Sequence, residues 1–166
     1  MSQRKSLIKG KKDEQIIDVT TTAEPEVIDG RGKFIFTDDS TYEGDYQLNV
    51  ADGSKKRHGS GIITWRQDPT ESYNGLWSED RMNGFGIYTF ASGAKYEGNM
   101  KDNNFDGDGE YAFADGAKYM GEWQQNKMHG SGEYIDPTGL AWKGRFFNGL
   151  FDSGQTHISL RLSEKI

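Results

Sequence analysis

The chain has 166 residues and a formal net charge of −6, and only 33% of its residues are hydrophobic although Gly reaches 22. One ordinary domain fits this length, but aliphatic side chains are too scarce for a compact two-layer core, so Phe, Tyr and Trp must supply most of the buried area. The absence of Cys excludes disulfides, thiolate catalysis and Cys-type zinc sites, and the acidic charge argues against nucleic-acid binding.

Residues 1–29 show no periodicity and begin with MSQRKSLIKGKKDEQ. This start lacks the apolar segment of a secretory signal, and no apolar run approaches membrane-spanning length, so we expect a soluble, cytoplasmic chain. The composition predicts a flexible N-terminal tail over 1–29, disordered or helical. A basic arm that docks on an acidic partner, such as a tubulin surface, is the alternative.

A repeat occupies residues 30–154, where an aromatic anchor recurs at intervals of 31, 23, 23 and 23 residues. Each anchor is followed by Gly two positions later and by a large apolar residue four positions later. A Gly-x-Gly pair then follows, and Gly30 and Gly32 open the array with the same pair. The anchors are Tyr42, Tyr73, Tyr96, Tyr119 and Trp142. This pattern predicts about five units.

The first interval is longer because the first unit contains an insertion. The inserted sequence ADGSKKRH (51–58) predicts an enlarged loop on one face of the array. Loop extensions of this size cost little, because the closure entropy grows only logarithmically with length.

Each unit predicts two antiparallel strands. In KYEGNM (95–100) and KYMGEW (118–123) the large residues alternate with others and share a face with the Gly. Gly beside an aromatic ring leaves space for the ring to lie on the neighbouring backbone. Residue types that tolerate a left-handed backbone recur at the turn positions, which are Asn49, Asp80, Asn103, Asn126 and Gly149. The prediction is an all-β, single-layer antiparallel meander of β-hairpin repeats, which could also curl on itself.

Residues 155–166 predict a capping strand or tail after the array. Ile158, Leu160 and Leu162 alternate with other residues from His157 onward, so they share one side of an extended segment. Such a strand would cover the last open sheet edge, or it would add to the sheet of a partner.

These residues resemble the MORN repeat, whose pattern is Tyr-x-Gly-x-Trp, a turn and Gly-x-Gly. The best matching segments are YMGEWQQNKMHGSG (119–132), YEGNMKDNNFDGDG (96–109) and YNGLWSEDRMNGFG (73–86). The resemblance implies a MORN solenoid that acts as a spacer or attachment surface, as in radial-spoke proteins, junctophilins and plant phosphoinositide kinases. From MNGFG (82–86) to the Leu-rich end, the chain is also similar to a small family member. That similarity implies a role in a cilium or flagellum (axoneme), in sperm development or at the cytoskeleton.

Reactive motifs are missing from the sequence. No Gly-Lys-Ser/Thr follows a glycine loop, and the Gly-x-Gly pairs do not extend to a dinucleotide fingerprint. Asp102, Asn104 and Asp106 open like a calcium loop, but Phe113 stands where that loop needs a bidentate Glu. We therefore expect no enzyme activity, no cofactor and no metal.

The leading hypothesis is a non-catalytic scaffold that binds other proteins, including axonemal or cytoskeletal ones. It predicts a groove for an extended or helical peptide, lined by Trp77, Tyr88, Phe90, Tyr111, Phe113, Trp123 and Tyr134. The competing interpretation is that these rings only hold the repeats together. A second hypothesis is a membrane or phosphoinositide module that uses Lys55, Lys56 and Arg57 at an anionic surface.

Overall fold

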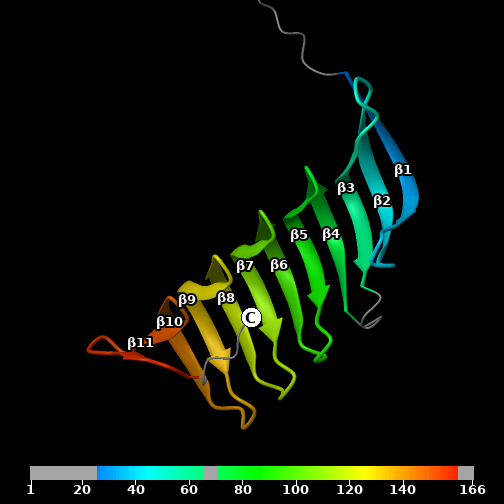
Figure 1. Ribbon diagram of the computed structural model, residues 1–166. Helices are drawn as coiled ribbons and strands as arrows, with labels where there is room; N and C mark the ends of the chain where they lie inside the picture. Colours follow the sequence, from blue (N-terminus) through cyan, green and yellow to red (C-terminus); the bar gives the residue numbers. More distant parts are fainter. Residues whose placement is uncertain (1–25, 66–70, 161–166) are drawn as a thin grey trace, which may run out of the picture.

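The computed structural model describes residues 26–65 and 71–160, which form one antiparallel sheet in a single layer (Figure 1). The strand order follows the sequence from β1 to β12, and the sheet is not closed. The all-β meander predicted from the sequence is therefore confirmed. The strands are β1 (Val27–Ile35), β2 (Thr41–Asn49), β3 (Lys55–Thr64), β4 (Ser72–Ser78), β5 (Arg81–Thr89), β6 (Lys95–Lys101), β7 (Asn104–Ala112), β8 (Lys118–Gln124), β9 (Lys127–Ile135), β10 (Ala141–Phe147), β11 (Leu150–Asp152) and β12 (His157–Ile158).

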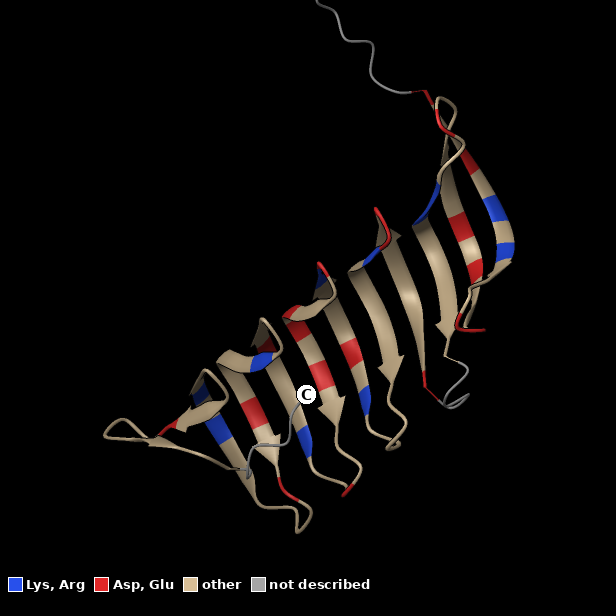
Figure 2. Cartoon of the chain, viewed as in Figure 1, with Lys and Arg blue, Asp and Glu red and all other residues tan. Residues whose placement is uncertain are grey.

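The two faces of the sheet differ because side chains alternate along each strand. On β6, Tyr96, Gly98 and Met100 are buried, whereas Glu97 and Asn99 between them are exposed. We call the buried side the ring face and the opposite side the outer face. Figure 2 shows acidic residues along β2, β6, β7 and β9, and this charge gives much of the outer face its polar character.

Four equivalent tyrosines form the centre of the ring face. We call them the tyrosine row: Tyr42, Tyr73, Tyr96 and Tyr119, each with an exposed fraction of 0%. Their rings lie over paired glycines of adjacent strands, so a Cβ added to Gly109 would stand 2.5 Å from the Tyr96 hydroxyl. Two neighbouring strands can therefore pack under one ring only where both carry Gly.

A β-bulge explains why the glycines occur as Gly-x-Gly. The β6–β7 register shifts between Gly98 and Met100, and Gly107 on the longer side adopts a left-handed φ of 101°. The second glycine of the pair, Gly109, lies under the Tyr96 ring instead. The Tyr96 hydroxyl donates to the Asn99 carbonyl at 2.7 Å, which satisfies a backbone acceptor at the bulge.

The hairpin turns have two consecutive left-handed residues, as in a type I′ turn. Asp102 and Asn103 have φ of 49° and 68°, and the equivalent pairs at 79–80, 125–126 and 148–149 behave alike. Four of the five predicted turn positions are thus left-handed. Asn49 is the exception, because it ends β2 and its side chain accepts a hydrogen bond from the Ala51 N–H across a wider turn.

The inserted segment does not form the enlarged loop that the sequence predicted. Lys55, Lys56 and Arg57 belong to β3 and pair with Leu48, Gln47 and Tyr46 of β2. The physical reason is that β2 is lengthened at the same end, so the extra residues of both strands find ladder partners. The loop itself shrinks to the short connection between Asn49 and Lys55.

The ends of the array also differ from the predicted boundaries. The strand β1 starts at Val27, which lies inside the region 1–29 that the sequence assigned to the tail. Residues 1–25 of that tail lie outside the described residues. At the other end, β12 pairs with β11 through Phe151↔Ile158 and Asp152↔His157, and Leu162 is outside the described residues.

Candidate functional site

A row of seven rings crosses the ring face near the ends of the hairpins that lie opposite the left-handed turns. Successive centroids are 4.4–6.3 Å apart, within the range of direct aromatic contact. We call this row the ring ladder. In order it contains Trp65, Tyr88, Phe90, Tyr111, Phe113, Tyr134 and Trp142.

Burial is uneven along the ring ladder. The central rings are nearly covered, with exposed fractions of 6% for Tyr111 and 2% for Tyr134. Trp65, Tyr88 and Phe90 at one end are only partly buried, as is Trp142 at the other end. A partner could therefore reach the ladder at its ends, while the centre holds adjacent repeats together.

The predicted groove residues all lie on the ring face, but they form two rows. Tyr88, Phe90, Tyr111, Phe113 and Tyr134 belong to the ring ladder. The two tryptophans, Trp77 and Trp123, lie instead among the tyrosine row.

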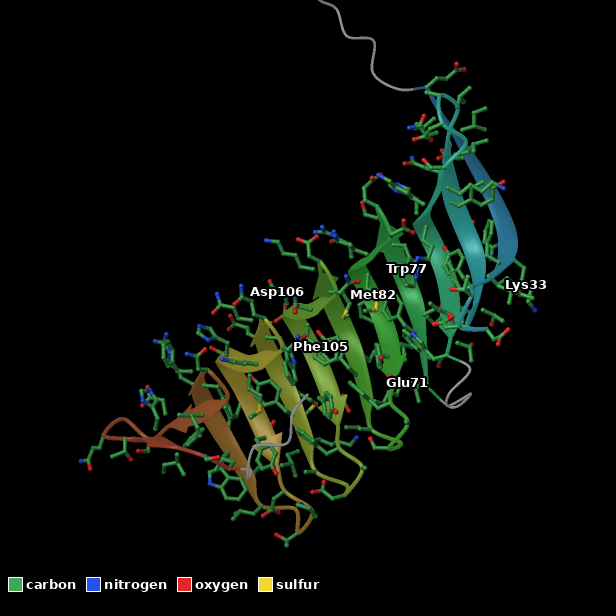
Figure 3. All side chains as sticks on the ribbon, viewed as in Figure 1. Lys33, Glu71, Trp77, Met82, Phe105 and Asp106 are labelled. Carbon is green, nitrogen blue, oxygen red and sulfur yellow. The ribbon has the colours of Figure 1, made fainter. Side chains whose placement is uncertain are left out.

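Trp77 and Trp123 stand edge-on between successive tyrosines. The Trp123 ring is 5.5 Å from Tyr96 and 5.2 Å from Tyr119, with interplanar angles of 88° in both cases. Its indole N–H donates to the Gly109 carbonyl at 3.2 Å, and Trp77 makes the same bond to Gly61 at 3.1 Å. In Figure 3, Trp77 of β4, Met82 of β5 and Phe105 of β7 follow one another along the sheet, so this row continues from the β4–β5 hairpin to the β6–β7 hairpin.

The predicted groove omitted three residues of this region. Trp65 and Trp142 extend the ring ladder at its two ends, and Glu71 accepts a hydrogen bond from the Tyr88 hydroxyl at 2.6 Å. Trp65 and Trp142 could have been found, because both follow the alternation of their strands. Glu71 could not, since it precedes β4 at a position that holds Ala in the next two repeats and Leu in the last.

Burial also fixes the ionisation of the tyrosine row. Removal from water raises the pKa of Tyr42 and of Tyr73 to about 12. The same cause raises the pKa of Tyr96 and of Tyr119. These phenols therefore stay protonated near neutral pH and serve as hydrogen-bond donors to backbone carbonyls, a structural use of the hydroxyl.

The basic segment of β3 is occupied by acidic partners. Lys56 forms an ion pair with Glu79, and the Arg57 guanidinium lies 3.1 Å from an Asp80 carboxylate oxygen and 4.2 Å from the Trp77 ring centroid. Lys55 lies above the Tyr46 ring at 4.9 Å. Two of the three predicted anion-binding side chains are thus paired with carboxylates of the chain, and the third lies over an aromatic ring.

The described residues contain no group of three or more His, Asp or Glu side chains that could hold a metal ion. The carboxylates that resemble a calcium loop make other contacts. Asp102 pairs with Arg81 at 3.0 Å, and Asp106 accepts from the Gln125 N–H at 3.3 Å. In the same part of the chain, no helix has the length and apolar character needed to cross a membrane.

The repeat that organises this face has a known counterpart. The MORN repeat family model matches residues 55–67, 73–95, 96–118 and 119–141. The last three matches each begin at an anchor tyrosine and continue through one Gly-x-Gly strand. No curated protein matches the chain.

Proposed function

We propose that this chain, in which MORN repeats build the sheet, is a non-catalytic scaffold that binds another protein on its ring face. MORN repeats are generally modules for protein or membrane interaction. The observation that carries the proposal is the partial burial of Trp65, Tyr88 and Phe90 at the open end of the ring ladder. Aromatic side chains in such positions offer large contact area at low cost in conformational entropy.

The shape of the sheet supports a peptide as the partner. The described residues form one layer, so no second sheet or helix covers the ring face (Figure 1). A segment laid across the hairpins would contact the half-buried rings in succession, because they belong to neighbouring units. The Tyr88 hydroxyl, held by Glu71, adds a polar group at the same place.

Selection of peptides from a displayed library against the purified chain tests this proposal. Phe90 and Phe85 make a matched pair, since Phe90 lies in the ring ladder while Phe85 on β5 is 52% exposed on the outer face. We expect Phe90→Ala to lower the affinity for the selected peptides at least about tenfold, because one aromatic anchor of the binding surface is lost. Phe85→Ala should leave their affinity unchanged.

Thermal unfolding of both variants serves as the control for folding. A loss of binding confined to Phe85→Ala would move the binding surface to the outer face and contradict the proposal. Equal affinities of all three proteins, with each variant folded, would also contradict it.

We further propose that the partner belongs to a cilium, flagellum or another cytoskeletal assembly, with the chain in the cytoplasm. The support is the resemblance of the segment from Met82 onward to the small MORN repeat-containing protein 2, which is associated with motile cilia and sperm development. Proximity labelling in a ciliated cell tests this location. Enrichment of axonemal proteins by the wild-type chain, but not by Phe90→Ala, is the expected result, and labelling without such enrichment would contradict it.

A membrane or phosphoinositide role has weaker support from the charges of β3. Lys56 and Arg57 would have to leave Glu79 and Asp80 before they could contact lipid phosphates. Co-sedimentation with phosphoinositide vesicles separates the two functions. Binding that survives Phe90→Ala and is lost with Lys55→Glu would favour the membrane.

A further inference from the structure

The strand β1 is a long edge strand with apolar side chains in water. It pairs over all nine residues with β2, and it is the first strand of the sheet order. Val27, Ile28, Ile35 and Phe36 have exposed fractions of 39–71%. Natural sheets usually shorten, cover or interrupt such an edge, because its unpaired backbone groups invite another strand.

Hydrogen bonds at both ends of β1 show which of its residues bond to β2 and which face the free edge. The Val50 N–H donates to the Glu26 carbonyl at 3.0 Å, and the Phe36 N–H donates to the Ser40 carbonyl at 2.9 Å. Bonded and non-bonded residues alternate in an antiparallel pair, so the even-numbered residues of β1 bond to β2. The odd-numbered residues direct their N–H and C=O groups to the free edge: Val27, Asp29, Arg31, Lys33 and Ile35.

We propose that a second copy of this chain pairs with β1 through an antiparallel β1–β1 contact that is centred on Arg31. In this register the free groups of each odd residue meet those of an odd residue in the other copy. Asp29 then stands opposite Lys33, and it does so twice because the contact is two-fold symmetric. Opposite charges in directly facing positions favour the pairing.

The same register continues the pattern of the ring face. Gly30 faces Gly32 of the other copy, so the paired glycines that run through the sheet extend across the contact. Val27 faces Ile35 on the outer side, and both are exposed in the single chain. The contact therefore removes apolar surface from water and keeps the rings of each copy over their own glycines.

Other registers satisfy fewer of these conditions. A contact centred on Gly32 places Arg31 opposite Lys33, which is repulsive. The register centred on Arg31 brings the two Arg31 side chains together, but each already pairs with Asp45 of its own β2 at 3.0 Å. The cationic pair at the centre is thereby flanked by two carboxylates.

The consequence for the scaffold is a doubled binding surface. An antiparallel strand pair has its two-fold axis perpendicular to the sheet, so both ring faces would look to the same side. Lys33, labelled in Figure 3, marks the end of the sheet where the second copy would join. Because only one strand from each copy meets, the association is weak and depends on concentration.

Charge reversal on the full chain tests the register by sedimentation velocity. Asp29→Lys puts Lys opposite Lys33 in its own dimer, and Lys33→Glu puts Glu opposite Asp29. Each variant alone should associate about tenfold more weakly than the wild type, while an equimolar mixture recovers wild-type association because both facing pairs become opposite in charge. Lys143→Glu, a reversal on the outer face of β10, should leave the association unchanged.

A backbone variant gives an independent readout. Lys33→Pro removes an N–H that faces the free edge and leaves the bonds from Gly32 and Phe34 to β2 in place. It should melt like the wild type and abolish dimers. Three results overturn the proposal. The wild-type chain could stay monomeric at millimolar concentration, as it would if another segment of the chain covers β1, or Lys33→Pro could fold and still form dimers. The third result is an equimolar mixture of Asp29→Lys and Lys33→Glu that associates no more tightly than either variant alone.

Discussion

At the scale of single residues, the second left-handed position of each turn links one repeat to the preceding one. The Asn126 N–H donates to the Phe105 carbonyl at 3.0 Å, and its side-chain oxygen accepts from the Phe105 N–H at 2.7 Å. Asn103 makes both bonds to Met82, and Asp80 makes both to Arg57. We call this pair of bonds the turn clasp.

Two substitutions at Asn126 separate the turn clasp from the backbone preference. Asn126→Gly keeps the left-handed backbone and loses the side-chain bonds to Phe105 and Asn104, so the free energy of unfolding should fall by about 1–2 kcal/mol. Asn126→Ala also forces a Cβ residue into a φ of 64°, which should bring the loss to about 2–3 kcal/mol. Urea denaturation measures both. Equal losses would show that the left-handed backbone at position 126 imposes no penalty on Ala, and an unchanged stability of Asn126→Gly would show that the side-chain bond contributes nothing.

The last turn lacks half of the clasp. Gly149 donates its N–H to the Met128 carbonyl at 2.9 Å, but it has no side chain to accept from Met128 in return. Gly149→Asn supplies that acceptor at a φ of 85°, which Asn tolerates. The melting temperature should rise, with a gain of about 0.5–1 kcal/mol in unfolding free energy. A lower melting temperature would mean that the turn cannot place the side chain on Met128.

At the scale of strands and hairpins, the glycines under the tyrosine row determine how closely two strands can approach. A Cβ on Gly98 would stand 2.4 Å from the Gly109 Cα and 2.6 Å from the Asp108 carbonyl oxygen. These are backbone atoms that cannot turn aside as a side chain would. The pairing of β6 with β7 thus depends on this residue.

Gly98→Ala and Gly116→Ala form a matched pair for this effect. Unlike Gly98, Gly116 has a left-handed φ, at 93°, and nothing lies within 4 Å of an added Cβ there. Gly116→Ala should therefore lower the free energy of unfolding only by the cost of a Cβ residue in a left-handed backbone, about 1–2 kcal/mol. Gly98→Ala should cost more, about 3 kcal/mol or above, because strands must separate. Denaturant unfolding compares them, and a reversed order would remove the packing explanation.

The sequence predicts the position of a residue where its partners lie in its own repeat, and it fails where the partners lie elsewhere. The anchor tyrosines and Gly-x-Gly pairs recur at a fixed spacing, so the sheet and its ring face could be predicted from the pattern. The positions of Lys55 and Arg57 could not, because a strand extension depends on partners in β2 that no local pattern identifies. The role of Glu71 was hidden for a similar reason, since its partner Tyr88 lies 17 residues further along the chain, on the facing strand β5.

At the scale of the whole molecule, a single layer must bury its apolar surface within one face. The buried hydrophobic residues form one continuous cluster from Tyr42 to Phe146. Each repeat is therefore stabilised mainly by its two neighbours, as in other solenoids. A change of conditions that weakens every repeat at once should therefore lower the free energy of unfolding strongly. A change at one end of the array should affect only the strands next to it.

Alkaline pH acts on all four tyrosines of the tyrosine row. Their pKa values are raised by burial, to about 12 for Tyr42 and Tyr73, whereas unfolded tyrosines titrate near about 10. Their contribution is complete below about pH 10 and is lost as the pH rises through the folded pKa values. Each tyrosine should lower the unfolding free energy by about 1.4 kcal/mol per pH unit above about pH 10.

Denaturant unfolding at several alkaline pH values checks this slope, with tyrosinate absorbance as the second signal. Tyr119→Phe removes one titrating group and should make the slope shallower by the share of one tyrosine. A stability that stays constant between neutral pH and about pH 11 would contradict the buried state of these phenols.

Hydrogen exchange should reveal the ends of the array and the state of β1 in one experiment. The amides of β11 and β12 should exchange faster than those of β6 to β9, since β12 pairs through only two residues. In β1 the even-numbered amides bond to β2 and should be protected at every protein concentration. The odd-numbered amides, such as Arg31 and Lys33, should be open in dilute solution and become protected as the concentration rises. A monomer offers these odd-numbered amides no strand to bond with, so protection that rises with concentration requires an added strand at the free edge. Protection of the same amides in dilute solution would mean that the chain itself already covers that edge.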